Sequence, residues 1–286
     1  MKFWRKAERG IEFVKTYRAH LGPFACIQSS PDGLYLATAS AADEYVKVFD
    51  VPSVDMINMV KIGFAPSTLC WAYRRSSPAL FFVVGDRQSR RLCKYDGRAS
   101  AAEGEGPVET IESVHADPVL VMEYVEPHDA ILSVDAKGII EYWSVRGESG
   151  HGLPFSHVTY RLKSDTDLYA LAKCKAVPVS LSLSRDLTKF VVTATDRQIR
   201  VFGLQSGKLL RQYDESVPAI LTERASSAGK RPSDDRNSDD MEFGARLALE
   251  RELVRASLMT NAGTHASHGP LLLRLPRILF FSSLLF

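Results

Sequence analysis

Histidine, aspartate and hydroxyl-bearing residues recur together in two stretches of the chain. They are His20, Ser40 and Asp43 in the first stretch, and His115, Ser133, Asp135 and Trp143 in the second. Such side chains could act as nucleophile and base in catalysis, or could bind a metal ion. They could equally form a buried hydrogen-bond network, which stabilises a fold only if every member has a hydrogen-bond partner. The elements that carry these residues decide between the interpretations.

Motifs that indicate a catalytic or metal site are absent from the sequence. It contains no phosphate-binding glycine loop, no HExxH, no nucleophile elbow and no paired-cysteine zinc spacing. The four cysteines are Cys26, Cys70, Cys93 and Cys174. Their scatter argues against a zinc site and a disulfide framework, and favours a reducing compartment, cytosol or nucleus. We predict no catalytic, cofactor-binding or metal-binding residues and no cofactor.

Two local clusters leave a second interpretation open. The basic cluster Arg87–Arg91 could contact phosphate, but such a cluster is more typical of a solvated turn between strands. His151 and His157 lie in one loop and could chelate a metal, although no cysteine or acid stands at ligand spacing. The net charge of +2 is too small for overall electrostatic attraction to favour nucleic acid or membrane as a partner.

Repeated short strands dominate the rest of the sequence. Five segments alternate apolar and polar residues and end on an aromatic residue at positions 4, 49, 95, 143 and 202, with spacings of 45, 46, 48 and 59. A WD repeat runs about 40–45 residues and forms one four-stranded blade. The sequence therefore predicts an all-β fold, an incomplete WD-repeat β-propeller. We expect about four full blades plus one strand of a preceding blade, with the insertion Leu162–Lys175 explaining the longest spacing.

The propeller prediction gives the polar residues a structural role. In WD repeats, an aspartate in the turn between strands hydrogen-bonds the opening histidine, which reaches a serine or threonine and the tryptophan. Here His20, Ser40 and Asp43 supply three members, with Phe49 in the tryptophan position. His115, Ser133, Asp135 and Trp143 supply all four, and Asp196 stands six residues before Phe202. We interpret these eight polar-network residues as structural rather than catalytic.

The chain divides into four predicted segments. Residues 1–221 form the propeller blades, 222–240 a disordered loop, 241–257 an amphipathic helix and 258–286 an atypical apolar tail. The loop is poor in apolar residues. Residues 271–286 are apolar, but they are fewer than the roughly 20 that a spanning helix needs. They also contain Arg274, Pro276 and Arg277. We therefore predict no membrane anchor.

Specific strings resemble one family, the nuclear WD-repeat cyclophilins, which carry an amino-terminal propeller and a carboxy-terminal peptidyl-prolyl isomerase domain. The strings are Met1–Lys6, Gly10–Lys15, Lys47–Val51, Asp55–Met59, Ile140–Trp143, Lys163–Tyr169, Ala172–Ala176, Gly207–Leu209, Tyr213–Ser216, Asp240–Gly244 and Glu250–Leu253. The resemblance covers roughly residues 1 to 256. The Phe-His-Arg string of the cyclophilin active site is absent, and the chain is expected to be truncated at both ends.

The resemblance implies a nuclear, spliceosome-associated protein. We predict a protein-binding scaffold that is not an enzyme and whose partners are other proteins, those of the spliceosome. The alternative is a peptidyl-prolyl cis-trans isomerase in the full-length protein, with this chain as its non-catalytic propeller. A nucleic-acid binder would need a basic stripe across several blades rather than one cluster. We therefore expect no small-molecule substrate, no direct nucleic-acid binding and no membrane.

Overall fold

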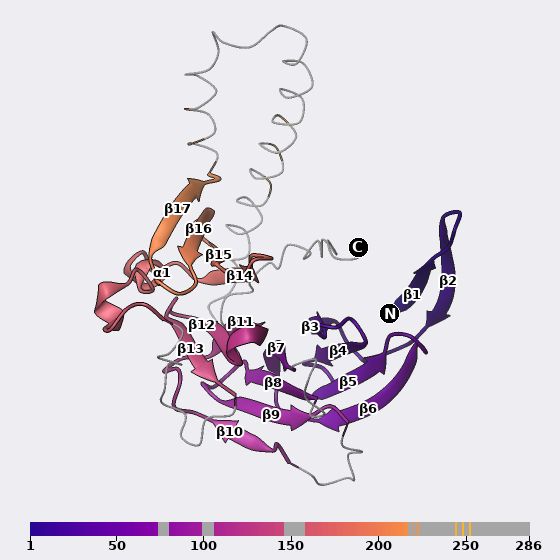
Figure 1. Cartoon of the computed structure of the whole chain (residues 1–286). Coiled ribbons are helices and arrows are strands. Elements are labelled where there is room, and N and C mark those ends of the chain that lie inside the picture. Colours follow the sequence, from indigo (N-terminus) through magenta and orange to yellow (C-terminus); the bar gives the residue numbers. More distant parts are fainter. Residues whose placement is uncertain are drawn as a thin grey trace, which may run out of the picture. The chain divides into compact units, whose positions relative to one another are not determined.

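The computed structural model describes residues 1–73, 80–98, 106–145 and 158–216, with Ala219, Thr222, Gly244, Ala248 and Glu252. Two compact units divide the chain, Met1–Ser216 and Val217–Phe286, and every described strand lies in the first. Figure 1 shows these strands as a series of separate sheets. All strand pairs are antiparallel, which confirms the predicted all-β class.

Each sheet follows the order of the sequence. The two-stranded sheet is β1 (Lys2–Lys6) and β2 (Ile11–Thr16). The next is β3 (Phe24–Ser29), β4 (Tyr35–Ser40), β5 (Tyr45–Asp50) and β6 (Asp55–Lys61). Then come β7 (Pro66–Ala72), β8 (Phe81–Asp86), β9 (Leu92–Asp96) and β10 (Glu109–Ile111). The last two are β11 (Val119–Val125), β12 (Ala130–Asp135) and β13 (Ile140–Ser144), and β14 (Pro178–Leu183), β15 (Lys189–Ala194), β16 (Gln198–Gly203) and β17 (Leu209–Asp214).

Turn chemistry explains where the strands stop. At Ser30–Gly33, Gly33 has a φ of +75°, and the Ser30 and Asp32 side chains accept hydrogen bonds from backbone amides. The Ser184–Asp186 turn repeats this arrangement. At the corresponding place between β11 and β12, the 3-10 helix η1 (Glu126–His128) ends on Asp129, which has a φ of +49°. Polar residues that can bond the local backbone therefore end the first strand in these three sheets.

Adjacent sheets pack through their first strands and through their faces. The strand β3 contacts β7, β7 contacts β11, and β11 contacts β14. A first strand beside the next first strand is the arrangement of propeller blades, and we call the four larger sheets blades 1 to 4. Three apolar clusters fill the spaces between successive blades. The core is thus shared between neighbours rather than enclosed within any blade.

The structure differs from the prediction before blade 1 and adds detail in blades 3 and 4. Two strands, β1 and β2, precede blade 1, where the sequence predicted one. Blade 3 has three described strands, and residues 146–157, which follow the third, lie outside the described residues. In the predicted insertion, the connection to blade 4 contains the 3-10 helix η2 (Lys163–Asp165) and the one-turn helix α1 (Ala170–Lys173), and Leu168 and Leu171 of this connection pack into the core.

The predicted carboxy-terminal segments are described at only a few residues. Gly244, Ala248 and Glu252 are helical, and they fall within the predicted helix 241–257. Thr222, the first residue of the predicted loop, is also helical. The remainder of 223–286, including the apolar tail, lies outside the described residues.

Candidate protein-interaction surface

One end of the blades gathers the connections that carry the predicted polar residues. In blades 1 to 4 the turn between the second and third strands lies at the end where the chain also enters the blade. The turns are residues 41–44, 87–91, 136–139 and 195–197, and the entering connections are 17–23, 62–65, 112–118 and 174–177. We call these eight segments together the turn face.

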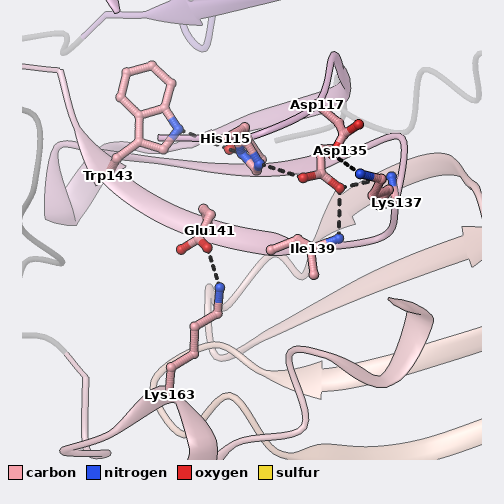
Figure 2. A network of polar contacts seen from close by, with 9 residues as sticks. His115, Asp117, Asp135, Lys137, Ile139, Glu141, Trp143 and Lys163 are labelled. Carbon is pink, nitrogen blue, oxygen red and sulfur yellow. Dashed lines mark hydrogen bonds and ion pairs between the residues drawn. The ribbon is translucent and has the colours of Figure 1, made fainter. Parts of the chain in front are cut away.

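In blade 3 the four predicted residues form one hydrogen-bonded chain (Figure 2). The Trp143 indole N–H donates to Ser133 Oγ at 3.0 Å, and Ser133 Oγ lies 2.7 Å from His115 Nε2. His115 Nδ1 lies 3.2 Å from Asp135 Oδ2. A carboxylate only accepts hydrogen bonds, so Nδ1 donates to Asp135, and in the neutral ring Nε2 accepts from the serine hydroxyl. Every member is satisfied, and the chain runs in one direction.

This arrangement contains the residue types of a serine hydrolase triad but not its accessibility. Ser133 and the His115 side chain are fully buried, and Asp135 is nearly so. The serine oxygen is already occupied by the Trp143 donor, so it faces no space that a substrate could enter. Asp135 also accepts bonds from the amides of Lys137 and Ile139 at 3.0 and 2.9 Å. The geometry fits a device that holds the 136–139 turn.

Blade 1 has a similar network with a different hydroxyl. His20 Nδ1 lies 2.9 Å from Asp43 Oδ2, and His20 Nε2 lies 2.9 Å from Thr38 Oγ1. The assignment of Ser40 to this place was wrong, because Ser40 Oγ instead accepts from the Ala42 amide at 3.3 Å. Thr38 and Ser40 lie on the same face of β4, but only Thr38 faces the ring in this register. The interval of 18 residues that separates His115 from Ser133 also separates His20 from Thr38 and could have identified it.

Blades 2 and 4 keep the aspartate but hold it with arginine. Asp196 pairs with both terminal nitrogens of Arg200, whose side chain is almost completely buried. Asp86 accepts from Ser89 Oγ at 2.8 Å and from Arg91 Nη2 at 3.2 Å. Partial burial raises the pKa of Asp196, but the Arg200 hydrogen bonds outweigh it and leave that pKa below its usual value. The Asp196 carboxylate therefore remains charged and bound in the blade 4 turn.

Backbone hydrogen bonds tie the turns to the entering connections. The amides of Arg87, Ala136 and Thr195 donate to the carbonyls of residues 65, 118 and 177, each at 2.9 Å. In blade 1 the Leu21 amide instead donates to the Asp43 carboxylate at 3.3 Å. Both segments of each blade end are thus fixed relative to one another. A fixed backbone reduces the conformational entropy that a partner must remove on binding.

Basic side chains project from these fixed turns. Arg87, Arg90, Lys137 and Arg197 are exposed. Lys137 pairs with Asp117 at 2.9 Å while its side chain remains 71% exposed. The basic cluster Arg87–Arg91 is only partly solvated. Arg91 is bound to Asp86, and its guanidinium lies 4.9 Å from the Phe64 ring centre. The turn face therefore presents basic groups from three blades.

Metal binding, membrane spans and cysteine thiols are the remaining features that the sequence raised. No group of three or more histidine, cysteine or acidic side chains there could hold a metal ion, and His151 and His157 lie outside it. Within the same residues, no helix is both long and apolar enough to cross a membrane. Burial raises the pKa values of the Cys70 and Cys93 thiols, which lie in the core between blades.

Comparison with known proteins agrees with this geometry. Residues 11–50 match the family model "WD domain, G-beta repeat", and this range runs from β2 through β5. Together with the repeated antiparallel blades, the match defines the chain as a WD-repeat protein with a propeller-like fold.

Individual relatives identify the family of the chain more closely. It is 36% identical to "Peptidyl-prolyl cis-trans isomerase cyp15" of Rhizopus delemar, over 95% of this chain and 42% of that protein. It is 38% identical to "Peptidyl-prolyl cis-trans isomerase CYP71" of Arabidopsis thaliana, over 89% of this chain and 38% of that protein. It is 37% identical to the human "Peptidylprolyl isomerase domain and WD repeat-containing protein 1", over 89% of this chain and 37% of that protein.

The chain is accordingly related to the WD-repeat-containing peptidyl-prolyl isomerases, and it corresponds to their WD-repeat region. This confirms the resemblance seen in the sequence. The chain spans about two fifths of the length of the relatives it matches.

Proposed function

We propose that this chain is a protein-binding scaffold, the non-catalytic propeller part of a nuclear, spliceosome-associated WD-repeat cyclophilin. WD repeats and relatedness to the peptidyl-prolyl isomerases with WD repeats support the general role. The single observation that carries the binding role is the turn face, where every second-to-third-strand turn is anchored through a bound aspartate. The partners, in this proposal, are spliceosomal proteins, and the chain acts in the nucleus.

The chemistry of the turn face suggests how it recognises a partner. Arg87, Lys137 and Arg197 lie on three different blades, so an acidic segment of a partner protein could contact them together. Arginine can bind carboxylates through two parallel hydrogen bonds, which adds geometric specificity. The anchored turns hold these groups in place before the partner arrives, which favours affinity.

Affinity capture from nuclear extract tests this surface. The double variant Arg87→Glu/Lys137→Glu should lose spliceosomal proteins that the unchanged chain retains. Arg185→Glu is the matched control, because Arg185 is exposed in the turn at the opposite end of blade 4. Equal capture by both variants would contradict binding through the turn face, and no recovery of spliceosomal proteins by the unchanged chain would contradict the proposed partners.

The alternative places isomerase activity in the full-length protein and none in this chain. A purified preparation of the chain should not accelerate cis–trans isomerisation of a prolyl peptide, and cyclosporin should have no effect on the rate. Cyclosporin-sensitive acceleration would show that the chain itself is catalytic. A fluorescent fusion should accumulate in the nucleus, and an even or cytoplasmic distribution would contradict the proposed location.

A further inference from the structure

Three arginines belong to one short turn of blade 2, between β8 and β9. They are Arg87, Arg90 and Arg91, and with the single negative charge of Asp86 they give the segment 86–91 a net charge of +2. The entering connection beside this turn, residues 62–65, contains no charged residue. Positive charge is therefore concentrated at this place on the turn face.

Hydrogen bonds of Asp86 and of the backbone fix the shape of this turn. The Asp86 carboxylate accepts from the Gln88 amide at 2.9 Å and from Ser89 Oγ at 2.8 Å. The Arg87 amide donates to the Ala65 carbonyl at 2.9 Å, which ties the turn to the entering connection. Asp86 itself is almost completely buried, so its carboxylate supports the turn from beneath and is not presented to solvent.

Arg91 is the most firmly oriented of the three arginines. Its guanidinium carbon lies 4.9 Å from the centre of the Phe64 ring, and its Nη2 donates to Asp86 Oδ2 at 3.2 Å. Phe64 is buried in the core between blades 1 and 2, so the ring is a rigid support. The Arg91 side chain is nevertheless 38% exposed. Since a guanidinium carries five N–H donors and Asp86 takes one of them, Arg91 can still bind an anion from solvent.

The other two arginines of the turn are exposed to solvent. Neither Arg87 nor Arg90 forms an ion pair with another residue in the part of the chain that the structure describes. Their long side chains leave the same fixed backbone as Arg91, so they can close on a group that Arg91 holds. A planar guanidinium suits this role, because its donors match the oxygens of carboxylate and phosphate groups.

We propose that this turn binds a phosphorylated serine or threonine of the partner protein, with Arg91 as the fixed contact and Arg87 and Arg90 closing over the phosphate. The inference rests on the proposed function and names the group that the acidic segment brings to blade 2. A phosphorylated side chain carries a charge of about −1.5 to −2 at neutral pH and three strong acceptor oxygens. These match the net charge of +2 and the three guanidinium groups, whereas a carboxylate brings one charge and two oxygens.

Nucleic acid fits the same turn less well. Each phosphodiester carries a single negative charge, and proteins that bind single strands add aromatic side chains on which the bases stack. Phe64, the aromatic side chain that this turn contacts, is buried and lies beneath Arg91. A phosphorylated protein segment is therefore the occupant that the charge and the packing favour.

Fluorescence anisotropy with a labelled synthetic peptide tests the site on the full chain. The peptide has phosphoserine at its centre and four glutamates on each side, and it should bind roughly tenfold or more tightly than the same peptide with serine or glutamate at the centre. Arg90→Gln and Arg91→Lys should each remove most of this preference. Arg91→Lys retains the charge but loses the planar donors. Arg185→Gln, at the exposed turn on the opposite end of blade 4, is the matched control and should keep the preference.

Three outcomes would overturn the proposal. They are equal affinity for the phosphoserine and serine peptides, a preference that persists in both turn variants, and tighter binding of an oligouridine RNA of equal length. Thermal unfolding of each variant is measured alongside, and if Arg91→Lys lowers stability, the exposed Arg90 decides the result. The capture experiment with nuclear extract tests the proposed function separately, because Lys137 lies outside this turn and can bind an acidic segment that carries no phosphate.

Discussion

At the scale of single residues, the aspartates of the turn face determine how firmly each turn is held. Asp135 accepts from His115 and from two backbone amides, and it is almost completely buried. Removing the carboxylate leaves several buried donors without an acceptor, and each such loss costs about 1–3 kcal/mol.

Asp135→Ala should therefore lower the free energy of unfolding by about 1–3 kcal/mol or more. Chemical denaturation monitored by tryptophan fluorescence measures the change. Asp214→Ala is the control, because Asp214 is exposed and accepts hydrogen bonds from the nearby Ser216. Equal stability of the Asp135 variant and the unchanged protein would show that the network does not stabilise the fold.

Asp43 gives this network a dependence on pH. Partial burial raises the pKa of Asp43, but the hydrogen bonds from His20 and the Leu21 amide outweigh it and bring that pKa below 3.8. A depressed pKa in the folded state means that the charged carboxylate stabilises the fold above pH 3.8. This contribution is lost as the pH falls through the folded-state pKa.

The stability difference between the unchanged protein and Asp43→Asn should thus be largest near neutral pH and should shrink as the pH falls below about 4. Urea unfolding of both proteins over a pH series measures it. A difference that is constant down to the lowest pH would show that ionisation of Asp43 does not contribute.

The sequence specified the acids and the histidines better than it specified their partners. Asp86 and Asp135 end a strand, and Asp43 and Asp196 lie in the turn directly after one, a position that a spacing pattern can locate. Thr38 and Ser40 lie on one face of β4, so the face alone does not choose between them, whereas the 18-residue interval from the histidine does. Arg200 was missed because arginine is almost never fully buried unless it is paired, and no sequence pattern marked the pair.

At the scale of elements, one glycine connects the blade 3 turn to the insertion before blade 4. Gly138 has a φ of +81°, and a Cβ atom there would lie 2.7 Å from the Leu171 Cβ of α1. Both the backbone conformation and the close approach of α1 require the missing side chain.

Gly138→Ala should destabilise the protein by about 1–3 kcal/mol, the usual cost of a strained backbone conformation, with further cost from the displaced helix. Thermal unfolding followed by circular dichroism measures it. Gly106→Ala is the matched control, because Gly106 has neither a positive φ nor any atom within 4 Å of an added Cβ. A Gly138 variant as stable as the Gly106 variant would show that α1 can be displaced without loss of stability.

Strand positions were predicted well because apolar alternation and turn residues are local signals. The strand count before blade 1 was wrong, because the second strand there carries a weak signal. β2 is exposed along its whole length, so it lacks the alternation that marks a half-buried strand. In blade 3 the predicted fourth strand stays a prediction, because residues 146–157, which follow β13, lie outside the described residues.

At the scale of the whole propeller unit, stability is unevenly distributed, because each sheet buries its faces only against its neighbours. Repeat proteins of this kind behave as a line of units joined by interfaces, and the end units are held from one side only. The central strand β8 is nearly all buried, whereas every residue of β2 is exposed.

Amide hydrogen exchange should therefore be fastest in β1 and β2, intermediate in β16 and β17, and slowest in β7 to β9. Peptide-level mass spectrometry of exchange at neutral pH measures the order. Uniform protection along residues 1–216 would show that the unit unfolds as a single cooperative body.

The different ways of holding the same aspartate have a consequence for how such a protein can change over time. In blades 1 and 3 a histidine from the entering connection holds the carboxylate, and in blades 2 and 4 an arginine from the turn or the third strand does so. Since either partner satisfies the same acceptor, a lineage can exchange one anchor for the other while the turn keeps its shape. The exposed residues beside that turn are then free to vary independently in each blade. A single scaffold can in this way acquire new partners one blade at a time without being redesigned.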